Sequence, residues 1–191
     1  MRMIATIMMV LAIAPEVHAI EDADSRLLVS REVAMTMQAR LKDELLQAIS
    51  AGGPVAAIEV CQTRAPEIAD QVGSEAGVRV WRTALRVRNP ENTPDERARE
   101  VLEAFAQRLG AGEDADTLES FTRSDDGSAR YMKAILTQPP CETCHGANIA
   151  EPVRKALAER YPDDQATGFV AGELRGAVVV DWLAAPPAVR N

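Results

Sequence analysis

The chain has 191 residues, of which 47% are hydrophobic and 26% are charged, and its formal net charge is −8. This length and composition are those of one compact globular domain. The excess of acidic residues argues against binding to nucleic acid or to an anionic membrane surface, and it leaves a basic protein partner open.

The amino terminus resembles a cleavable signal peptide. Arg2 precedes an apolar run over residues 3–14, and the Val-His-Ala segment at 17–19 resembles a signal-peptidase site. About a dozen apolar residues are short for a membrane span. We therefore expect cleavage after Ala19 rather than an uncleaved anchor, with residues 20–191 forming a single periplasmic domain that has no stable membrane span.

Two helices are predicted next. Apolar residues at three- to four-residue steps predict a long helix over residues 22–50. Gly53 ends it and Pro54 can open the next helix. In that second helix Cys61 follows the apolar spacing, so it is expected to point to the core, and Pro66 is expected to kink or interrupt the helix.

The remainder of the chain predicts a small antiparallel sheet with helices beside it. A strand over 78–87 is followed by a turn at 89–92 and by a helix that opens at Thr93 and closes at Gly110. The further expected elements are strands over 117–123 and 129–137, a short helix over 150–161 and a buried strand over 176–183. This order predicts the α+β class, with a small antiparallel sheet and a long N-terminal helix.

The segment Cys141-Glu-Thr-Cys144-His145 carries the strongest functional signal of the sequence. A Cys-x-x-Cys-His run is typical of covalent c-type haem attachment. The thiols of Cys141 and Cys144 would add to the porphyrin vinyl groups, and His145 would be the proximal iron ligand. We therefore predict one covalently attached haem c, which agrees with export because this maturation takes place outside the cytoplasm in bacteria.

Two other chemistries fit parts of this motif. With Cys61 the motif adds up to a Cys3His zinc set, but the adjacent residues Cys144 and His145 would have to face one tetrahedral ion. A dithiol redox pair would need an activated cysteine at a helix start, and Pro139-Pro140 before the motif argues against that. Haem attachment is the preferred interpretation.

The second axial position of the haem is open in the sequence. Cleavage of the leader removes His18, so His145 becomes the only histidine. The candidates are Cys61, a methionine, a lysine, the free amino terminus, water or no ligand. We favour Cys61, the one thiol not used for attachment, with Met132 as the runner-up. A thiolate ligand predicts a low reduction potential, because it stabilises ferric iron.

Ordered short motifs over residues 25–185 resemble one family. They are Ile58-Glu-Val-Cys61, Ala65-Pro66-Glu-Ile68-Ala69, Arg82-Thr83, Arg88-Asn89-Pro90-Glu-Asn92, Arg130-Tyr131 and Cys141-x-x-Cys144-His145-Gly146. This pattern is similar to the PAS-like c-type haem domain, known from a cyanobacterial photosystem-associated protein and from extracytoplasmic sensors of histidine kinases and chemoreceptors. The resemblance implies a PAS-like antiparallel sheet flanked by helices, and axial ligation by His145 and Cys61.

Four residues outside the attachment motif are candidates for contacts with the haem pocket or the haem propionates. They are Arg82, Arg88, Asn89 and Tyr131. Arginine forks bind carboxylates well, although a solvated basic face explains the arginines equally. Arg88 and Asn89 are singled out by the family resemblance alone.

Three functional classes follow from these features. The preferred one is an exported mono-haem c-type cytochrome acting in low-potential electron transfer or redox sensing, with a separate redox or signalling protein as its partner. The alternative is a diatomic-gas or redox sensor module that signals to a separate partner. A haem enzyme is disfavoured, because it needs an open iron site with distal acid–base groups. A homodimer through the long first helix is left open.

Overall fold

The computed structural model describes residues 15–184, with side chains from residue 25 onward. Residues 1–14 of the expected leader lie outside the described residues, so the leader stays a prediction. Within residues 15–184, no helix is both long enough and apolar enough to span a bilayer. The elements in chain order are α1 (Pro15–Glu59), η1 (Val60–Arg64), α2 (Ala65–Ala76), β1 (Arg79–Thr83), η2 (Pro90–Asn92), α3 (Glu96–Gly110), η3 (Ala115–Thr117), β2 (Glu119–Arg123), β3 (Ala129–Leu136), η4 (Pro139–Cys141), α4 (Glu142–His145), α5 (Glu151–Arg160) and β4 (Leu174–Trp182).

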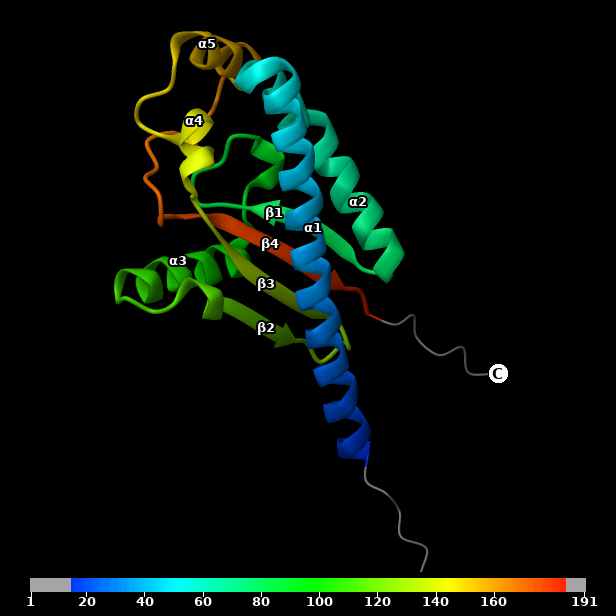
Figure 1. The fold of residues 1–191 in the computed structure, drawn as a ribbon. Helices are drawn as coiled ribbons and strands as arrows, with labels where there is room; N and C mark the ends of the chain where they lie inside the picture. The colour runs from blue at the N-terminus through cyan, green and yellow to red at the C-terminus, as the bar shows by residue number, and fades with distance from the viewer. Residues whose placement is uncertain (1–14, 185–191) are drawn as a thin grey trace, which may run out of the picture.

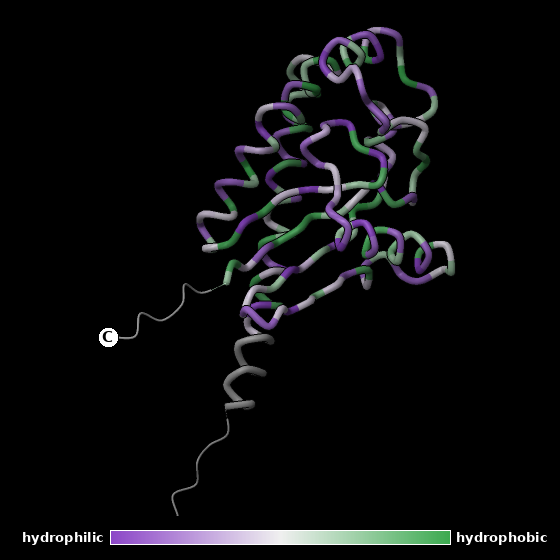
Figure 2. Tube along the Cα trace, turned by 180° about the vertical axis from the view of Figure 1, so that it is seen from behind, coloured by the Kyte–Doolittle hydropathy of each residue, from purple (hydrophilic) through white to green (hydrophobic). Residues whose placement is uncertain are grey.

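The strands form one antiparallel sheet in the order β1-β4-β3-β2. Helices α1 and α2 cover one face of this sheet and α3 covers the other (Figure 1). The central strands are the most apolar part of the chain, as the green tube in Figure 2 shows, and residues 178–180 of β4 are fully buried. The predicted α+β class with a long N-terminal helix is confirmed.

Each face of the sheet has its own hydrophobic core. The core on the α1 and α2 side consists of Val33, Ala34, Met37, Ile68, Ala69, Val72, Val80, Tyr131, Val178 and Val180. The core on the α3 side consists of Ala98, Leu102, Phe105, Leu118, Met132, Ala134, Ala177 and Val179. A third, smaller cluster joins the end of α1 to α5 through Ile58, Val153, Leu157 and Tyr161.

The first helix is broken at the expected place. Gly53 has a φ of 75° and a ψ of −177°, which are not helical angles, and Pro54 starts the segment that follows. That segment widens into the π-helical turn η1, in which the N–H of Ala65 donates to the carbonyl of Val60, five residues back. Pro66 explains the widening, because proline lacks an N–H and clashes with the carbonyl four residues before it. Cys61 lies in this π-helical turn.

Strand β1 is shorter than the strand predicted over 78–87. It is an edge strand that pairs only with β4, and the pairing ends at Thr83 opposite Ala177. The chain then leaves the sheet and runs toward the Cys-x-x-Cys-His motif, where the carbonyl of Val87 accepts a hydrogen bond from the N–H of Gln165. Alternating apolar and polar residues continue past Thr83, which is why the pattern extends the strand too far.

Candidate functional site

The Cys-x-x-Cys-His motif lies on one short helical segment, formed by η4 and α4. Cys141, Cys144 and His145 are all partly buried. The segment ends at Gly146, whose N–H donates to the carbonyl of Glu142. A Cβ at Gly146 would lie 2.6 Å from that oxygen, so only glycine fits directly after the histidine.

The imidazole of His145 is held in one orientation. Its Nδ1 lies 2.7 Å from the carbonyl oxygen of Ala166, and because a carbonyl can only accept, Nδ1 carries the proton and donates. Burial, together with the charges of Arg175 and Arg88, lowers the pKa of His145 to about 2. The ring is therefore neutral, and its Nε2 keeps a lone pair for a metal ligand bond.

A buried ion pair positions the loop that orients His145. Arg88 and Asp164 are 3.0 Å apart, and their side chains are 8% and 11% exposed. Arg88 also donates to the carbonyl oxygens of Cys144 at 2.5 Å and Ala166 at 3.2 Å. The other oxygen of Asp164 accepts from the N–H of Ala166 at 2.7 Å. One guanidinium thus connects the attachment motif to the residue whose carbonyl holds the histidine.

Cys61 lies in η1, directly after the end of α1. Ile58, one helical turn before it, belongs to the small cluster with Leu157 and Tyr161, against which Cys144 packs. Burial raises the pKa of Cys144, and the charge of Cys61 is among the further causes. Cys61 thus follows a residue of the cluster against which Cys144 packs, although the two cysteines are 83 positions apart in the chain as numbered. The fold brings the turn that carries Cys61 to the same cluster as the attachment motif.

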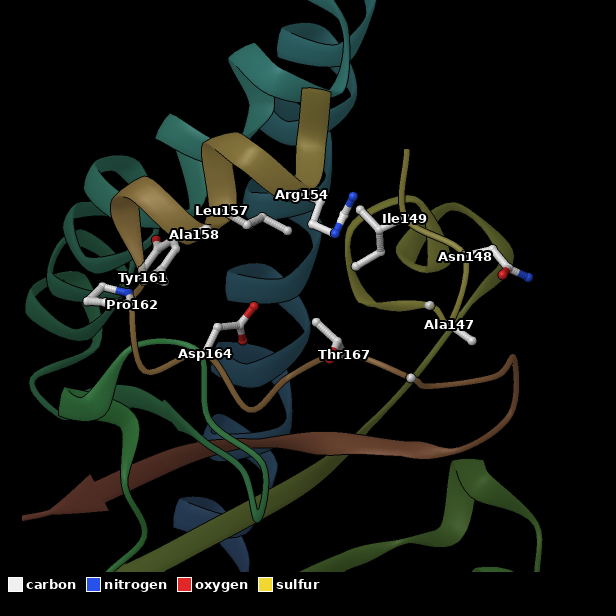
Figure 3. A pocket seen from close by; sticks show the side chains of 12 residues that line it. Ala147, Asn148, Ile149, Arg154, Leu157, Ala158, Tyr161, Pro162, Asp164 and Thr167 are labelled. Carbon is white, nitrogen blue, oxygen red and sulfur yellow. The ribbon is translucent and has the colours of Figure 1, made fainter. Parts of the chain in front are cut away.

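A cavity of about 760 Å³ lies directly beside the motif (Figure 3). Figure 3 shows Leu157 and Ala158 of α5, and Tyr161 just after it, along one side of the cavity, and Asp164 and Thr167 on the other. The full lining is Gly146, Ala147, Asn148, Ile149, Arg154, Leu157, Ala158, Tyr161, Pro162, Asp164, Thr167 and Gly168. Its volume lies within the range of about 300–1,000 Å³ that is typical of ligand and cofactor pockets. The cavity begins right after His145, but the predicted cysteine and histidine ligands themselves do not line it.

The other candidate residues lie in different places. Met132 is 1% exposed in the core under α3, on the opposite face of the sheet from the cluster near Cys61. Tyr131 lies in the core under α1, where its hydroxyl donates to Glu119. The side-chain oxygen of Asn89 accepts from the N–H of Glu91 and caps η2. Met132, Tyr131 and Asn89 are therefore engaged away from the motif.

Arg82 lies on the face of the sheet that α1 and α2 cover. It pairs across the sheet with Val178, which faces these helices, so both residues lie on that face. Burial lowers the pKa of Arg82, and the charges of Cys61 and Tyr161 act against this.

Three residues of the site have no clear signal in the sequence. The carbonyl of Ala166 orients His145, but a backbone group has no side-chain signature. Asp164 stands in an irregular loop, where no periodicity indicates its direction. Arg175 acts on the pKa of His145 from β4, at a β-bulge where Ile135 pairs with Gly176 and Leu136 with Leu174. A bulge of this kind can be found in a sequence only through its glycine, here Gly176.

The zinc alternative gains nothing from this geometry. Among the residues described with side chains, no three His, Cys, Asp or Glu side chains come together as a metal-binding group. The Cys3His set of the sequence is therefore not assembled in this structure.

The comparisons with known proteins agree with this fold. The family model for the Tll0287-like domain matches residues 13–182. Among solved structures, the chain is similar to the crystal structure of the cyanobacterial heme-protein Tll0287, with a TM-score of 0.57 and 20% sequence identity over 93% of this chain and 99% of that chain. A comparison with curated proteins gave no match. The family match confirms the membership predicted from the ordered motifs.

Proposed function

The chain belongs to the Tll0287-like family, and on this premise we propose that it is a haem-binding protein, an exported mono-haem c-type cytochrome. One haem would be attached through Cys141 and Cys144, with His145 and Cys61 as axial ligands. A haem held there would supply an iron that takes up and releases one electron. The relative of known structure is itself described as a heme-protein. The remaining support comes from the residues of this chain.

The state of His145 is the observation that carries the proposal. Its Nδ1 donates to a backbone carbonyl and the ring is neutral, which is how histidine ligands of metals are commonly held. The Arg88–Asp164 pair fixes the loop that provides this carbonyl. A histidine that only filled the core would not need a fixed tautomer in which Nε2 keeps its lone pair.

Cys61 supports the second half of the proposal. Cys61 lies in the π-helical turn η1, and such turns are frequent at functional sites. Met132, the runner-up, is packed between the sheet and α3. A thiolate at Cys61 would favour ferric iron, so a low reduction potential is expected.

The proposed role is low-potential electron transfer or redox sensing with a separate protein partner. The alternative role, a sensor of diatomic gases, is favoured by one feature. Cys61 lies inside the π-helical turn that follows the break at Gly53, so the segment that carries it is irregular. A ligand on such a segment can leave the iron more easily than one on a regular helix.

The test is spectroscopy of the protein made with the bacterial machinery for c-type haem attachment. The wild type should carry covalent haem, show a low-spin thiolate signature in electron paramagnetic resonance, and have a clearly negative midpoint potential. Cys61→Ala should keep the covalent haem, lose the thiolate signature and raise the midpoint. Met132→Leu is the matched control and should change neither property.

Each result has a defined meaning. An unchanged ferric spectrum in Cys61→Ala would contradict the proposed axial pair. Loss of the ligand signature in Met132→Leu instead would move the ligand to that methionine. A wild type without covalent haem would overturn the c-type assignment. Carbon monoxide uptake with release of the thiolate would favour the sensor role over the carrier.

A further inference from the structure

Three arginine side chains gather beside the attachment motif. Arg82 comes from β1, Arg88 from the segment just after it, and Arg175 from β4. Arg88 donates to the carbonyl oxygen of Cys144, and the guanidinium of Arg175 lies near the ring of Phe169, which stands edge-on to His145. Arg82 precedes Thr83, whose carbonyl oxygen lies against Gly176, the residue after Arg175. The three arginines therefore come from neighbouring backbone positions beside the motif, and the charges of Arg88 and Arg82 are among the causes that lower the pKa of Arg175.

Only one of the three has a carboxylate partner of its own. Arg88 pairs with Asp164 and donates to the carbonyl oxygens of Cys144 and Ala166. Its charge is balanced and its fork is engaged by the protein. Arg88 is therefore engaged within the protein, and Arg82 and Arg175 are the two other cations beside the motif.

Arg82 and Arg175 form no ion pair with a carboxylate of the described residues, although the charge of Asp164, the partner of Arg88, also favours the charged form of Arg175. The groups whose charges favour the charged form of Arg82 are Cys61 and Tyr161, and no carboxylate of the described residues is among them. The Nε of Arg175 is buried without a hydrogen-bond partner in the described part of the chain. Its Nη1 reaches the carbonyl of Arg86 at 3.3 Å. A partly buried guanidinium without an ion-pair partner is costly, so a group from outside the chain is expected to supply one.

The bulge in β4 aims Arg175 toward the motif. Arg175 is the extra residue between two successive pairs of β3 and β4. The next residue must be glycine, because a Cβ at Gly176 would lie 2.3 Å from the carbonyl oxygen of Thr83. Bulges often redirect a side chain beside a functional site. The guanidinium of Arg175 lies 5.3 Å from the ring of Phe169, whose ring stands edge-on to His145 at 6.3 Å.

We propose that Arg82 and Arg175 together bind the two propionates of the haem, and that Arg88 does not. This inference rests on the proposed function, because it requires a haem at Cys141 and Cys144. A haem carries two carboxylates, which match the two unpaired cations in number and charge, and guanidinium forks suit carboxylates. The thiolate of Cys61 does not replace them, because its charge is taken up by the iron.

The experiment uses resonance Raman bands of the propionates in the haem-loaded protein, together with a redox titration. Arg82→Met and Arg175→Met should each shift the propionate bending bands and lower the midpoint, because loss of a nearby positive charge favours ferric iron. Arg86→Met is the matched control. Arg86 stacks on the same Phe169 at 3.6 Å, but it is exposed and pairs with Glu173. This control should leave the bands in place.

Two conservative variants keep the test decisive if a methionine variant fails to fold. Arg82→Lys and Arg175→Lys keep the charge and lose the fork, so the bands should still shift while the midpoint changes little. Haem-loaded variants at both positions with unmoved bands would overturn this inference alone. A wild type that attaches no haem would overturn the proposed function, and this inference with it.

Discussion

Arg88 shows how one side chain can decide the geometry of a whole site. Arg88 donates to the carbonyl of Cys144 in the motif and to the carbonyl of Ala166. The same Ala166 carbonyl accepts the hydrogen bond from Nδ1 of His145. The sequence-based interpretation offered Arg88 as a propionate contact. Its partners in the structure are instead Asp164 and two backbone carbonyls, so we regard it as a positioning residue.

The substitution Arg88→Ala should therefore destabilise the protein strongly. It removes the cation that pairs with Asp164 and that donates to the carbonyl oxygens of Cys144 and Ala166 in a buried place. Breaking a buried ion pair by removing one partner costs about 3–5 kcal/mol. Urea denaturation followed by circular dichroism would measure this loss in the free energy of unfolding.

Arg40→Ala is the control for this prediction. Arg40 also forms a two-pronged pair, with Glu75, but both side chains are exposed. Water screens and replaces such a pair, so little change in the free energy of unfolding is expected. Equal effects of the two substitutions would show that burial of the Arg88 pair contributes nothing.

At the residue scale, the sequence predicts only what side-chain chemistry encodes. The motif at Cys141, Cys144 and His145 can be recognised because its spacing is typical of covalent haem attachment. The carbonyl of Ala166 is not legible, since any residue provides one. The axial role of Cys61 stays a prediction, and the fold adds that Ile58, one helical turn before it, shares an apolar cluster with Cys144.

At the scale of elements, the side chains proposed for the site lie where a helix or a strand is irregular. Cys61 is in a π-helical turn, Arg175 is in a β-bulge, and Arg88 follows the early end of β1. Periodicity predicts regular helices and strands, so it finds the elements and misses these exceptions. Two of these irregularities are marked in the sequence. Pro66 marks the π-helical turn, because proline has no backbone N–H to donate. Gly176 marks the β-bulge, because a Cβ there would meet the carbonyl of Thr83.

The break in α1 offers a clean test of one such exception. The φ and ψ of Gly53 lie in a region that is almost restricted to glycine, so Gly53→Ala should lower the free energy of unfolding by about 1–3 kcal/mol. Gly110→Ala, at the end of α3, is the matched control. A Cβ would meet nothing within 4 Å at either position.

The two alanine variants differ in backbone angle and not in packing. Gly110→Ala should raise the free energy of unfolding by up to about 1 kcal/mol, because alanine favours a helix more than glycine does. Thermal denaturation of both variants would give the two signs. A stabilised Gly53→Ala would mean that α1 can run on through residue 53 as a straight helix, which would move Cys61 away from the motif.

At the scale of the whole molecule, two helices on one face and one on the other leave an end of the sheet where α1, α4 and α5 meet (Figure 1). The α+β class, predicted from the order of periodic segments, and the family, predicted from ordered short motifs, are both confirmed. The site at this end combines residues from both halves of the chain. Its assembly depends on how firmly α1 is attached to the sheet.

Glu119 of β2 makes that attachment sensitive to acid. Its carboxylate accepts hydrogen bonds from Arg31 of α1 and from the hydroxyl of Tyr131 on β3. The hydrogen bond from Arg31 is the main cause that lowers the pKa of Glu119 below its usual 4.5. Since the folded pKa lies below the unfolded one, this stabilisation is complete above about pH 4.5 and is lost as the pH falls through the folded pKa.

The variant Glu119→Gln should expose this dependence. The difference in free energy of unfolding between wild type and variant should be largest above about pH 4.5 and should narrow as the solution becomes more acidic. Urea denaturation at a series of pH values would measure it, with Glu103→Gln, an exposed residue of α3, as the control. A difference that does not change with pH would mean that α1 is held to the sheet by its apolar contacts alone, and that the Arg31–Glu119–Tyr131 contacts follow from the fold without stabilising it.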